Sequence, residues 1–389
     1  MHNFINTFLK EQENKNLLRR LRVINKKKDV VLKINNKSYI DFSSNDYLSL
    51  SGHKVLIKTA KQYTAKYGTG GNASRLLSGT MEFHIELENK IAKLKQKESG
   101  LLFGNGFIAN TTIIPALLNK RDVIFADRLV HASIIDGILL SGCKFFRFKH
   151  NDMNHLEHLL KNERKNYEKA LIITESVFSM DGDIADLKSI TALKNKYNAL
   201  LYVDEAHATG IFGKTGAGII EELSLTEETD IIMGTFGKAL GSYGAYVVSD
   251  FALRNYLINK SRGFIYSTAL PASVIGASIA AIDLLKKEPF RRKDLLSNSD
   301  YLRNSLKKFG IKTIGETQII PVIIGDSTVA VKIAEQLIQK GYFVLPIRPP
   351  TVPYNSSRIR LSLNYKHSKK IIDKFISDFI KIYESTVKK

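Results

Sequence analysis

The sequence predicts an α/β protein with a large, mostly parallel sheet and a smaller α+β C-terminal domain. In the central part of the chain, short apolar runs alternate with longer amphipathic segments, which is typical of a parallel sheet covered by helices on both faces. After about residue 280 the pattern changes to a charged helical segment followed by separated strand-like runs. The length of 389 residues also exceeds what one hydrophobic core usually serves.

Five buried strands are expected in the large domain, because each run is short, apolar and bounded by Gly, Asp or Ser. They are Val123–Ala126, Ala170–Thr174, Ala199–Val203, Ile231–Thr235 and Ala245–Val248. Between two of them, the segment 186–197 has the Leu and Ile spacing of an amphipathic helix.

The C-terminal third predicts a charged helix, three strands and a final Lys-rich helix. The helix is expected over Lys286–Lys308, and the strands over Ile320–Ile324, Phe343–Ile347 and Ile359–Leu363. We therefore expect three parts: residues 1–45 as an N-terminal arm or part of the small domain, 46–280 as the large domain, and 281–389 as the small domain.

The formal net charge of +20, from 58 Lys and Arg against 38 Asp and Glu, raises the question of a nucleic-acid partner, because phosphate contacts dominate that kind of affinity. No aromatic RNA-binding motif, zinc-finger spacing or basic helix accompanies the charge. A Lys- and Asn-rich solvated surface explains it more simply, so no nucleic-acid partner is expected. A third interpretation is that part of the charge attracts an anionic substrate or an acidic carrier.

Cysteine usage and hydropathy favour a cytoplasmic protein. Cys143 is the single cysteine, which excludes disulfides within the chain and cysteine metal clusters and suits a reducing compartment. The N-terminus lacks an apolar signal core. The least polar stretch, around 270–285, contains Pro271 and Asp283 and is too short and interrupted to span a membrane. We expect no membrane partner and no metal.

A lysine in a glycine-rich bend is the strongest local signal for chemistry. In TFGKALGSYGA, residues 235–245, an expected strand ends at Thr235 and Lys238 follows among glycines. Glycines permit unusual backbone angles and the close approach of a planar ligand, and a desolvated lysine can act as a nucleophile. Taken alone, the segment also suits an ordinary surface lysine, so support from elsewhere in the chain is needed.

The segment LLYVDEAHATGIFG, residues 200–213, supplies that support. Its apolar start predicts a central parallel strand, and Asp204 and His207 follow at the carboxyl end, where open α/β sheets bind ligands. A carboxylate there can hold a protonated pyridine nitrogen, as pyridoxal phosphate requires in order to accept electrons. The alternative is that Asp204 only caps the next helix. No Walker sequence accompanies DEAH, which excludes its interpretation as a helicase motif.

Three further segments place polar groups after expected strands. In GLLFGNGF the turn Gly104–Gly106 opens a helix whose free N–H groups suit a phosphate, with Gly106 and Phe107 as backbone donors. In ADRLVHASIIDG, His131 is placed where it can stack over a flat ring, although a lone histidine is more often structural. The segment ESVFSMDGD adds polar side chains just past the strand that ends at Thr174, namely Glu175, Ser176, Ser179 and Asp181. Strand ends that converge on one side of one sheet predict a single site.

These segments, in this order, resemble the α-oxoamine synthases, a branch of the fold-type-I pyridoxal-phosphate enzymes. The resemblance runs from DFSSNDYLSL, which starts at Asp41, through YGTGGNASRLLSGT to SRIRLSL, which ends at Leu363, so it covers most of the chain. It implies the architecture of a fold-type-I PLP-dependent transferase, with a large mostly parallel-sheet domain and a smaller α+β C-terminal domain. It also implies a homodimer.

The resemblance implies roles for the matching positions. Lys238 would form the Schiff base with pyridoxal 5'-phosphate, Asp204 would hold its pyridine nitrogen, and His131 would stack on its ring, so these three are the expected catalytic residues. The remaining expected contacts are Gly106, Phe107, Ser179, His207 and Thr235 to the cofactor, Ser267 or Thr268 to the phosphate from a neighbouring subunit, and Arg19, Asn45, Thr351 and Arg360 to the substrates.

Among the substrate residues, Arg360 would bind the amino-acid carboxylate in bidentate fashion, whereas Arg19 and Thr351 would meet the acyl group. The run LLRRLR leaves the register of Arg19 open, and a solvated helix-face arginine is the alternative.

The segment IRPPTVP, residues 347–353, most resembles the branch that serves biotin biosynthesis. That branch joins L-alanine to a pimeloyl thioester with loss of carbon dioxide. The alternatives are a related synthase that uses glycine with acetyl-CoA or succinyl-CoA and, less favoured, a basic nucleic-acid-binding protein. Whether the partner is pimeloyl-CoA or pimeloyl-acyl carrier protein stays open, since both are anionic.

Overall fold

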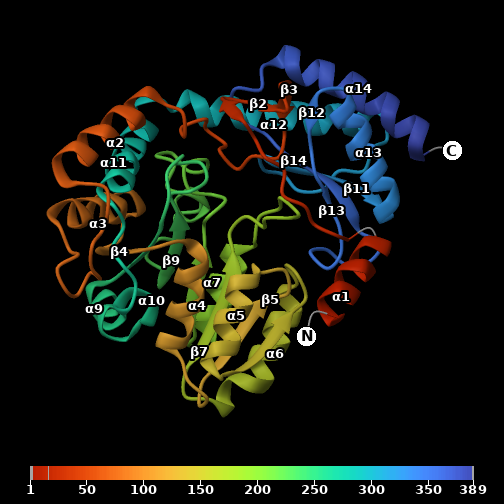
Figure 1. Ribbon diagram of the computed structural model, residues 1–389. Coiled ribbons are helices and arrows are strands. Elements are labelled where there is room, and N and C mark those ends of the chain that lie inside the picture. Colours follow the sequence, from red (N-terminus) through yellow and green to blue (C-terminus); the bar gives the residue numbers. More distant parts are fainter. Residues whose placement is uncertain (1–2, 16, 388–389) are drawn as a thin grey trace. The chain divides into compact units, whose positions relative to one another are not determined.

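The structure, a computed structural model, describes residues 3–15 and 17–387 and divides the chain into two units (Figure 1). The larger unit consists of Leu50–Ser179 and Ile184–Arg292, and the smaller unit of Met1–Ser49, Met180–Asp183 and Lys293–Lys389. The N-terminal residues thus fold with the C-terminal part. The boundary expected near residue 280 falls inside a helix that ends at Lys287, and the larger unit continues to Arg292.

A seven-stranded sheet forms the centre of the larger unit. Its strand order is β4-β10-β9-β8-β7-β5-β6, and only β10 runs antiparallel to its neighbours. The strands are β4 (Ser99–Phe103), β5 (Val123–Asp127), β6 (Lys144–Phe148), β7 (Ala170–Glu175), β8 (Leu200–Asp204), β9 (Ile231–Thr235) and β10 (Ala245–Ser249). The five expected strands and the mostly parallel sheet are therefore confirmed.

Helices connect and cover these strands, and α4 and α5 lie side by side against the sheet in Figure 1. Those of the larger unit are α2 (Lys54–Tyr67), α3 (Glu82–Lys95), α4 (Gly106–Leu117), α5 (Ala132–Ser141), α6 (Met153–Glu163), η1 (Arg164–Asn166), α7 (Leu187–Lys196), α8 (Ile219–Glu222), α9 (Phe251–Lys260), α10 (Arg262–Ile265) and α11 (Ala272–Lys287).

Burial explains why the central strands were recognisable and β6 was not. All residues of β5, β7 and β10 are buried, so their sequences are continuous apolar runs, as strands covered on both faces require. Strand β6 lies at the edge of the sheet and exposes Lys144 and Arg147. Charged side chains on edge strands discourage pairing with other chains, but they also interrupt the apolar pattern.

The smaller unit contains two sheets, with strand orders β1-β2-β3-β12 and β11-β14-β13. Strand β3 pairs in parallel with β12, so the N-terminal segment is hydrogen-bonded to the C-terminal part of the chain. The elements are α1 (Asn3–Asn14), β1 (Lys26–Lys28), β2 (Val31–Ile34), β3 (Lys37–Asp41), α12 (Phe290–Lys308), β11 (Ile319–Gly325), α13 (Ser327–Gln339), β12 (Tyr342–Phe343), β13 (Pro346–Ile347), β14 (Ser357–Ser362) and α14 (Lys369–Val387).

Two elements expected in this part of the chain are divided in the structure, each at a proline. The helix predicted over 286–308 is the end of α11 plus α12, which begins directly after Pro289. Proline lacks an amide hydrogen and disfavours helical geometry in the residue before it. The strand predicted over 343–347 is divided into β12, which pairs with β3, and β13, which starts at Pro346 and pairs with β14.

Among residues 3–15 and 17–387, every helix falls short of the length or apolar character that crossing a bilayer requires.

A buried histidine helps to hold the smaller unit together. His367 is fully buried, and its Nδ1 accepts a hydrogen bond from the Asn364 N–H at 2.9 Å. Its Nε2 lies 3.1 Å from the carbonyl oxygen of Asp41, and its ring stacks on Phe42 with 4.3 Å between the centroids. Burial lowers the pKa of His367 to about 3, so the folded chain keeps this imidazole neutral.

We predict a pH-dependent stability from His367. The unfolded chain binds a proton near pH 6.5 and the folded chain does not, so this contribution is complete above about pH 6.5 and is lost as the pH falls toward 3, at up to about 1.4 kcal/mol per pH unit. Urea unfolding between about pH 4.5 and 7.5 measures it. The variant His367→Gln should lack this slope, whereas His158→Gln, at an exposed histidine, should keep it. Parallel curves for the wild type and His367→Gln would contradict the prediction.

Candidate active site

The candidate site lies at the carboxyl ends of three neighbouring strands of the larger unit. Strands β7, β8 and β9 run parallel and end at Glu175, Asp204 and Thr235. In the register of the sheet, Glu175 is paired with Asp204, and Asp204 with Met233. Because paired residues of parallel strands project to the same face, the two carboxyl groups lie next to each other. This is the edge at which open α/β sheets bind ligands.

Asp204 is held by two hydrogen bonds. Its Oδ2 accepts from the Asn110 side chain at 3.0 Å, and its Oδ1 accepts from the Ala206 N–H at 2.9 Å. The side chain is buried, with 5% of the residue exposed. Both oxygens of this buried side chain therefore have hydrogen-bond donors, as buried polar groups require.

Asn110, on helix α4, links Asp204 to the neighbouring groups of the site. Its amide nitrogen also donates to the Ser133 hydroxyl at 3.0 Å, and its oxygen accepts from the Tyr202 hydroxyl at 2.6 Å. The Ser133 hydroxyl lies 2.8 Å from Nδ1 of His131. One buried amide therefore connects the strand end that carries Asp204 to the turn that carries His131.

The sequence reasoning did not find Asn110, Tyr202 or Ser133. Asn110 lies in the apolar segment IANTTII, and the polar residue on a buried helix face was the available signal, since a buried amide needs partners. Tyr202 lies two residues before Asp204 on the same strand, so both side chains project to the same face. Ser133 gave no signal of its own, because helix starts often contain serine.

Lys238 projects from a tight turn after β9. Within this turn, the Gly241 N–H donates to the Lys238 carbonyl at 2.9 Å, and the Ser242 N–H donates to the Phe236 carbonyl at 2.8 Å. Gly241 has a φ of 62°, and a Cβ there would lie 2.3 Å from the nitrogen of Ser51. Only glycine fits that position. Phe236 is fully buried, which anchors the turn while Lys238 stays partly accessible.

Lys238 and Asp204 act electrostatically on the same two groups. Burial raises the pKa of Glu175 well above its ordinary value, and the Asp204 charge raises it further, whereas the Lys238 charge opposes the shift. Desolvation lowers the pKa of His131, with the Lys238 charge acting in the same direction and the Asp204 charge against it. The four side chains that were expected from separate segments are therefore brought into one electrostatic cluster.

The first turn of α4 contains the two residues that are expected to donate to a phosphate. The Asn105 side chain accepts from the Ile108 N–H at 2.9 Å, and the N–H groups of Gly106 and Phe107 belong to the open first turn, which has no acceptor within the helix. A Cβ on Gly106 would lie 3.0 Å from Cγ2 of Thr235. Glycine thus lets the helix start close to the end of β9, and both expected donors are present next to Thr235.

The remaining expected cofactor residues of the larger unit differ in exposure. His207 is buried in the turn after β8, and Ser179 is half-buried in the segment after β7. Thr268 is exposed and forms an isolated antiparallel bridge with Ser74. Its exposure leaves it accessible to another molecule.

In the smaller unit, Arg360 and Asn45 lie together. Both terminal nitrogens of Arg360 are 3.5 Å from the Asn45 side-chain oxygen, and one donates to the Ser362 hydroxyl at 2.6 Å. The Tyr47 hydroxyl donates to the same Asn45 oxygen at 3.1 Å. Burial raises the pKa of Tyr47, and the Arg360 charge partly offsets the shift. Tyr47 was not predicted, because DFSSNDYLSL alone does not show which of its side chains face the arginine.

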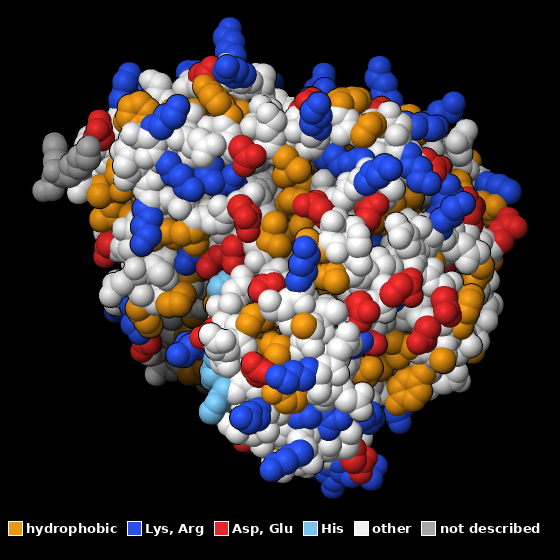
Figure 2. All heavy atoms as spheres, turned by 180° about the vertical axis from the view of Figure 1, so that it is seen from behind, with side chains coloured by type: hydrophobic (Ala, Val, Ile, Leu, Met, Phe, Trp, Pro, Cys, Tyr) orange, Lys and Arg blue, Asp and Glu red, His pale blue; other side chains and the backbone are white. Residues whose placement is uncertain are grey.

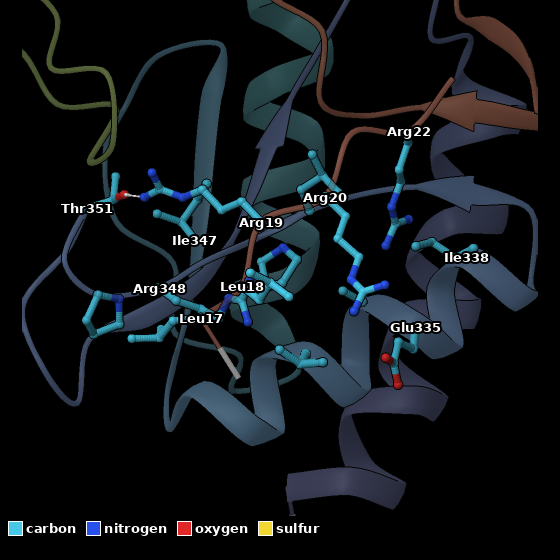
Figure 3. Close-up of a pocket in the computed structure, with 15 residues that line it drawn as sticks. Leu17, Leu18, Arg19, Arg20, Arg22, Glu335, Ile338, Ile347, Arg348 and Thr351 are labelled. Atoms are coloured by element: carbon cyan, nitrogen blue, oxygen red, sulfur yellow. Dashed lines mark hydrogen bonds between the residues drawn. The ribbon is translucent and has the colours of Figure 1, made fainter. Parts of the chain in front are cut away.

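Arg19 and Thr351, the other expected substrate residues, also lie together in the smaller unit. Their side chains are 3.4 Å apart at the wall of a cavity of about 440 Å³ (Figure 3). The cavity is lined by Arg20, Arg22 and Arg348 as well, and Glu335 is its acidic lining residue. Burial lowers the pKa of Arg348, and repulsion from Arg19 adds to the shift. The arrangement suits an anionic group with an apolar chain, since the walls also include leucine and isoleucine.

Asp181, which the sequence placed with the polar groups after β7, is engaged within the smaller unit. Its carboxylate accepts a hydrogen bond from the guanidinium of Arg358, which is buried. Asp181 therefore has a structural partner there.

Comparisons with known proteins identify the family of the chain. The chain matches the family described as Aminotransferase class I and II over residues 37–379. It is 41% identical to the 8-amino-7-oxononanoate synthase of Geobacter sulfurreducens over 377 residues, which is 96% of each chain. It is also similar to a solved serine palmitoyltransferase of S. paucimobilis with bound PLP, at a TM-score of 0.93 and 28% identity, over 99% of this chain and 98% of that one. The 8-amino-7-oxononanoate synthase of Francisella tularensis gives a TM-score of 0.77 and 29% identity, over 89% of this chain and 98% of that one.

The fold and these similarities define a PLP-dependent transferase of fold type I, as the sequence resemblance implied. The chain belongs to the aminotransferase class I and II family and, within it, to the α-oxoamine synthases.

We predict that the Asn110 network is energetically coupled. The variant Asn110→Leu should destabilise the chain by about 1–3 kcal/mol, because it leaves the buried Tyr202 hydroxyl and one Asp204 oxygen without a partner. When Tyr202→Phe is combined with it, the pair should cost less than the sum of the two single changes. Denaturant unfolding of the three variants completes the cycle, and strictly additive costs would contradict the coupling.

Proposed function

We propose that this chain condenses L-alanine with a pimeloyl thioester, releasing carbon dioxide and forming 8-amino-7-oxononanoate for biotin biosynthesis. It is thus a PLP-dependent acyltransferase. The observation that carries the proposal is the placement of Asp204 at the carboxyl end of β8 and of Lys238 in the turn after the neighbouring parallel strand β9. Similarity to 8-amino-7-oxononanoate synthases over nearly the whole chain supports it.

The residues present fit pyridoxal phosphate. Asp204 is a buried carboxylate with donors on both oxygens, as the partner of a protonated ring nitrogen must be. The open N–H groups of Gly106 and Phe107 suit the phosphate, and a side chain on Gly106 would fill the space next to Thr235. In the proposal, the other contacts to the cofactor come from His131, Ser179, His207, Thr235 and, across a subunit boundary, Thr268.

Each chemical task in the reaction falls to a named side chain. When bound, pyridoxal phosphate supplies an electron-accepting ring joined to the substrate nitrogen. The Lys238 amine removes the proton from the alanine α-carbon and later returns one to the product, and a positioned base contributes about 10²–10⁴-fold to the rate. Asp204 keeps the ring nitrogen protonated. The lowered pKa of His131 keeps its imidazole neutral, so its face can pack against a flat ring.

The smaller unit supplies the substrate contacts in this proposal. Arg360, oriented by Asn45 and Ser362, binds the alanine carboxylate through its planar guanidinium. Arg19 and Thr351 bind the acyl group in the arginine-lined cavity.

The proposal includes a homodimer in the cytoplasm. Large apolar side chains are exposed on the larger unit, with Phe107 at 50%, Leu139 at 60%, Leu140 at 67% and Tyr266 at 72% exposure. Exposed apolar side chains of this size mark surfaces that other chains cover. In the proposal a second copy covers this surface, and the exposed Thr268 contributes to a phosphate site of the neighbouring subunit.

The two alternative functions predict a different protein surface or different substrates. A nucleic-acid-binding function needs a continuous basic stripe, whereas the face in Figure 2 has Lys and Arg side chains with Asp and Glu between them. A synthase that uses glycine with acetyl-CoA or succinyl-CoA shares the same fold and lysine. Similarity to 8-amino-7-oxononanoate synthases favours the pimeloyl reaction over it.

We predict that Lys238→Ala abolishes the covalent attachment of pyridoxal phosphate and lowers kcat/KM by at least about 10²–10⁴-fold. Absorption spectra before and after borohydride reduction measure the attachment. Lys260→Ala, at an exposed lysine on α9, is the matched control and should behave like the wild type. A visible, reducible lysine adduct in Lys238→Ala would refute the assignment.

Substrate choice is tested with the wild-type enzyme. Alanine with pimeloyl-CoA or pimeloyl-acyl carrier protein should release carbon dioxide at a kcat/KM at least about tenfold above glycine with acetyl-CoA or succinyl-CoA, which corresponds to about 1.4 kcal/mol. Higher activity with glycine and a shorter acyl group would replace the proposed reaction by the related one.

A further inference from the structure

We propose, on the basis of the proposed function, that Glu175 is a positioning residue that works as a neutral acid, keeping its proton next to the Asp204 carboxylate while it holds the main chain at His131. Glu175 ends strand β7 at the edge of the sheet that carries Asp204, and it is 3% exposed.

The sheet register forces two carboxyl groups into neighbouring positions. Glu175 on β7 and Asp204 on β8 are paired residues of neighbouring parallel strands. In the sheet, β8 lies between β7 and β9. Two carboxylates at this spacing repel each other strongly in a buried place, so the proton is retained by one of the pair.

The distribution of hydrogen-bond donors decides which carboxyl group keeps the proton. Asp204 accepts from Asn110 and from the main chain at Ala206. Oε1 of Glu175 is buried and has no hydrogen-bond partner among the described residues. A buried carboxylate oxygen without a donor is costly, whereas a protonated carboxyl group tolerates the same place far better. Asp204 is therefore the charged member and Glu175 the neutral one.

The charged and titratable groups around Glu175 come from several elements. Asp204 and Asp127 raise the pKa of its carboxyl group, after burial as the main cause, and Lys238 lowers it. The main-chain N–H of His131 also donates to this carboxyl group and lowers its pKa. The net direction is well above the ordinary value, in agreement with the geometry.

The neutral acid gives the site a single negative charge where the ring nitrogen needs one. If Glu175 ionised, a second carboxylate would compete with Asp204 for the Lys238 ammonium and for the ring nitrogen. The same side chain holds the backbone at His131, whose ring lies at the start of α5. The number of negative charges near the ring nitrogen and the position of the His131 ring thus both depend on the proton of Glu175.

Infrared spectroscopy of the cofactor-free protein tests the protonation directly. The difference spectrum between the wild type and Glu175→Gln near neutral pH should contain the carbonyl band of a protonated carboxylic acid. Glu227→Gln, at an exposed glutamate, is the control and should remove only carboxylate bands. A Glu175→Gln difference spectrum with carboxylate bands alone would overturn the proposal.

Cofactor affinity tests the positioning. Glu175→Gln keeps a neutral group and an acceptor for the His131 N–H, so its Kd for pyridoxal phosphate should stay within about threefold of the wild type, whereas Glu175→Leu should raise the Kd by roughly 5- to 150-fold. At alkaline pH, where Glu175 loses its proton, the Kd should rise less in Glu175→Gln than in the wild type. Equal affinity in Glu175→Leu, or a large loss in Glu175→Gln, would overturn the role.

The two proposals fail in different ways. If the wild type binds no pyridoxal phosphate, the proposed function is wrong, and the infrared comparison still reports on the proton of Glu175. If Glu175→Leu does not fold, the infrared comparison and the pH dependence of Glu175→Gln decide the question by themselves.

Discussion

The buried side chain of Asn110 is the interaction on which the candidate site depends. It joins helix α4 to the end of strand β8 and to the start of helix α5, because its amide serves Asp204, Ser133 and Tyr202 at once. A buried amide that satisfies several partners fixes all of them in one arrangement, since each partner would otherwise lose its hydrogen bond in a place without water. This one residue therefore helps to orient the acid, together with the Ala206 N–H, and through Ser133 it is linked to His131.

At the end of strand β8, two consecutive acids differ in their surroundings: Asp204 belongs to the candidate site, whereas Glu205 has structural partners. Glu205, the next residue, forms a buried ion pair with Lys95 at 2.6 Å and accepts from the Ile220 N–H. Successive residues of an extended chain project to opposite faces. One acid of the DEAH segment is thereby directed to the cluster around Lys238, and the other holds helix α3 to the fold. The neighbouring acid Glu175 completes the contrast, because its Oε1 is buried and has no hydrogen-bond partner among the described residues, whereas Asp204 has donors on both oxygens.

In the smaller unit, hydrogen-bond partners and neighbouring charges likewise determine the surroundings of the arginines. Arg19 has a hydroxyl partner in Thr351, and its charge helps to lower the pKa of Arg348 across the arginine-lined cavity. Like charges held close together favour an anion between them. Arg360 instead has its orientation set by Asn45 and Ser362. In the proposed reaction, the anionic groups of the substrates therefore provide the negative charge that pairs with these arginines.

The sequence by itself determined the parallel sheet, the strand ends that carry Asp204 and Lys238, and the helix start at Gly106, because each depends on a local pattern of apolar runs and glycines. It also carried the family, since the motifs follow one another in order. Only the tertiary structure decided the roles of Asn110 and Tyr202, the divided strand at Pro346, and the pairing of Glu175 with Asp204. These features arise from contacts between segments far apart in the chain, and the burial and hydrogen bonds that set a charge exist only when those segments meet.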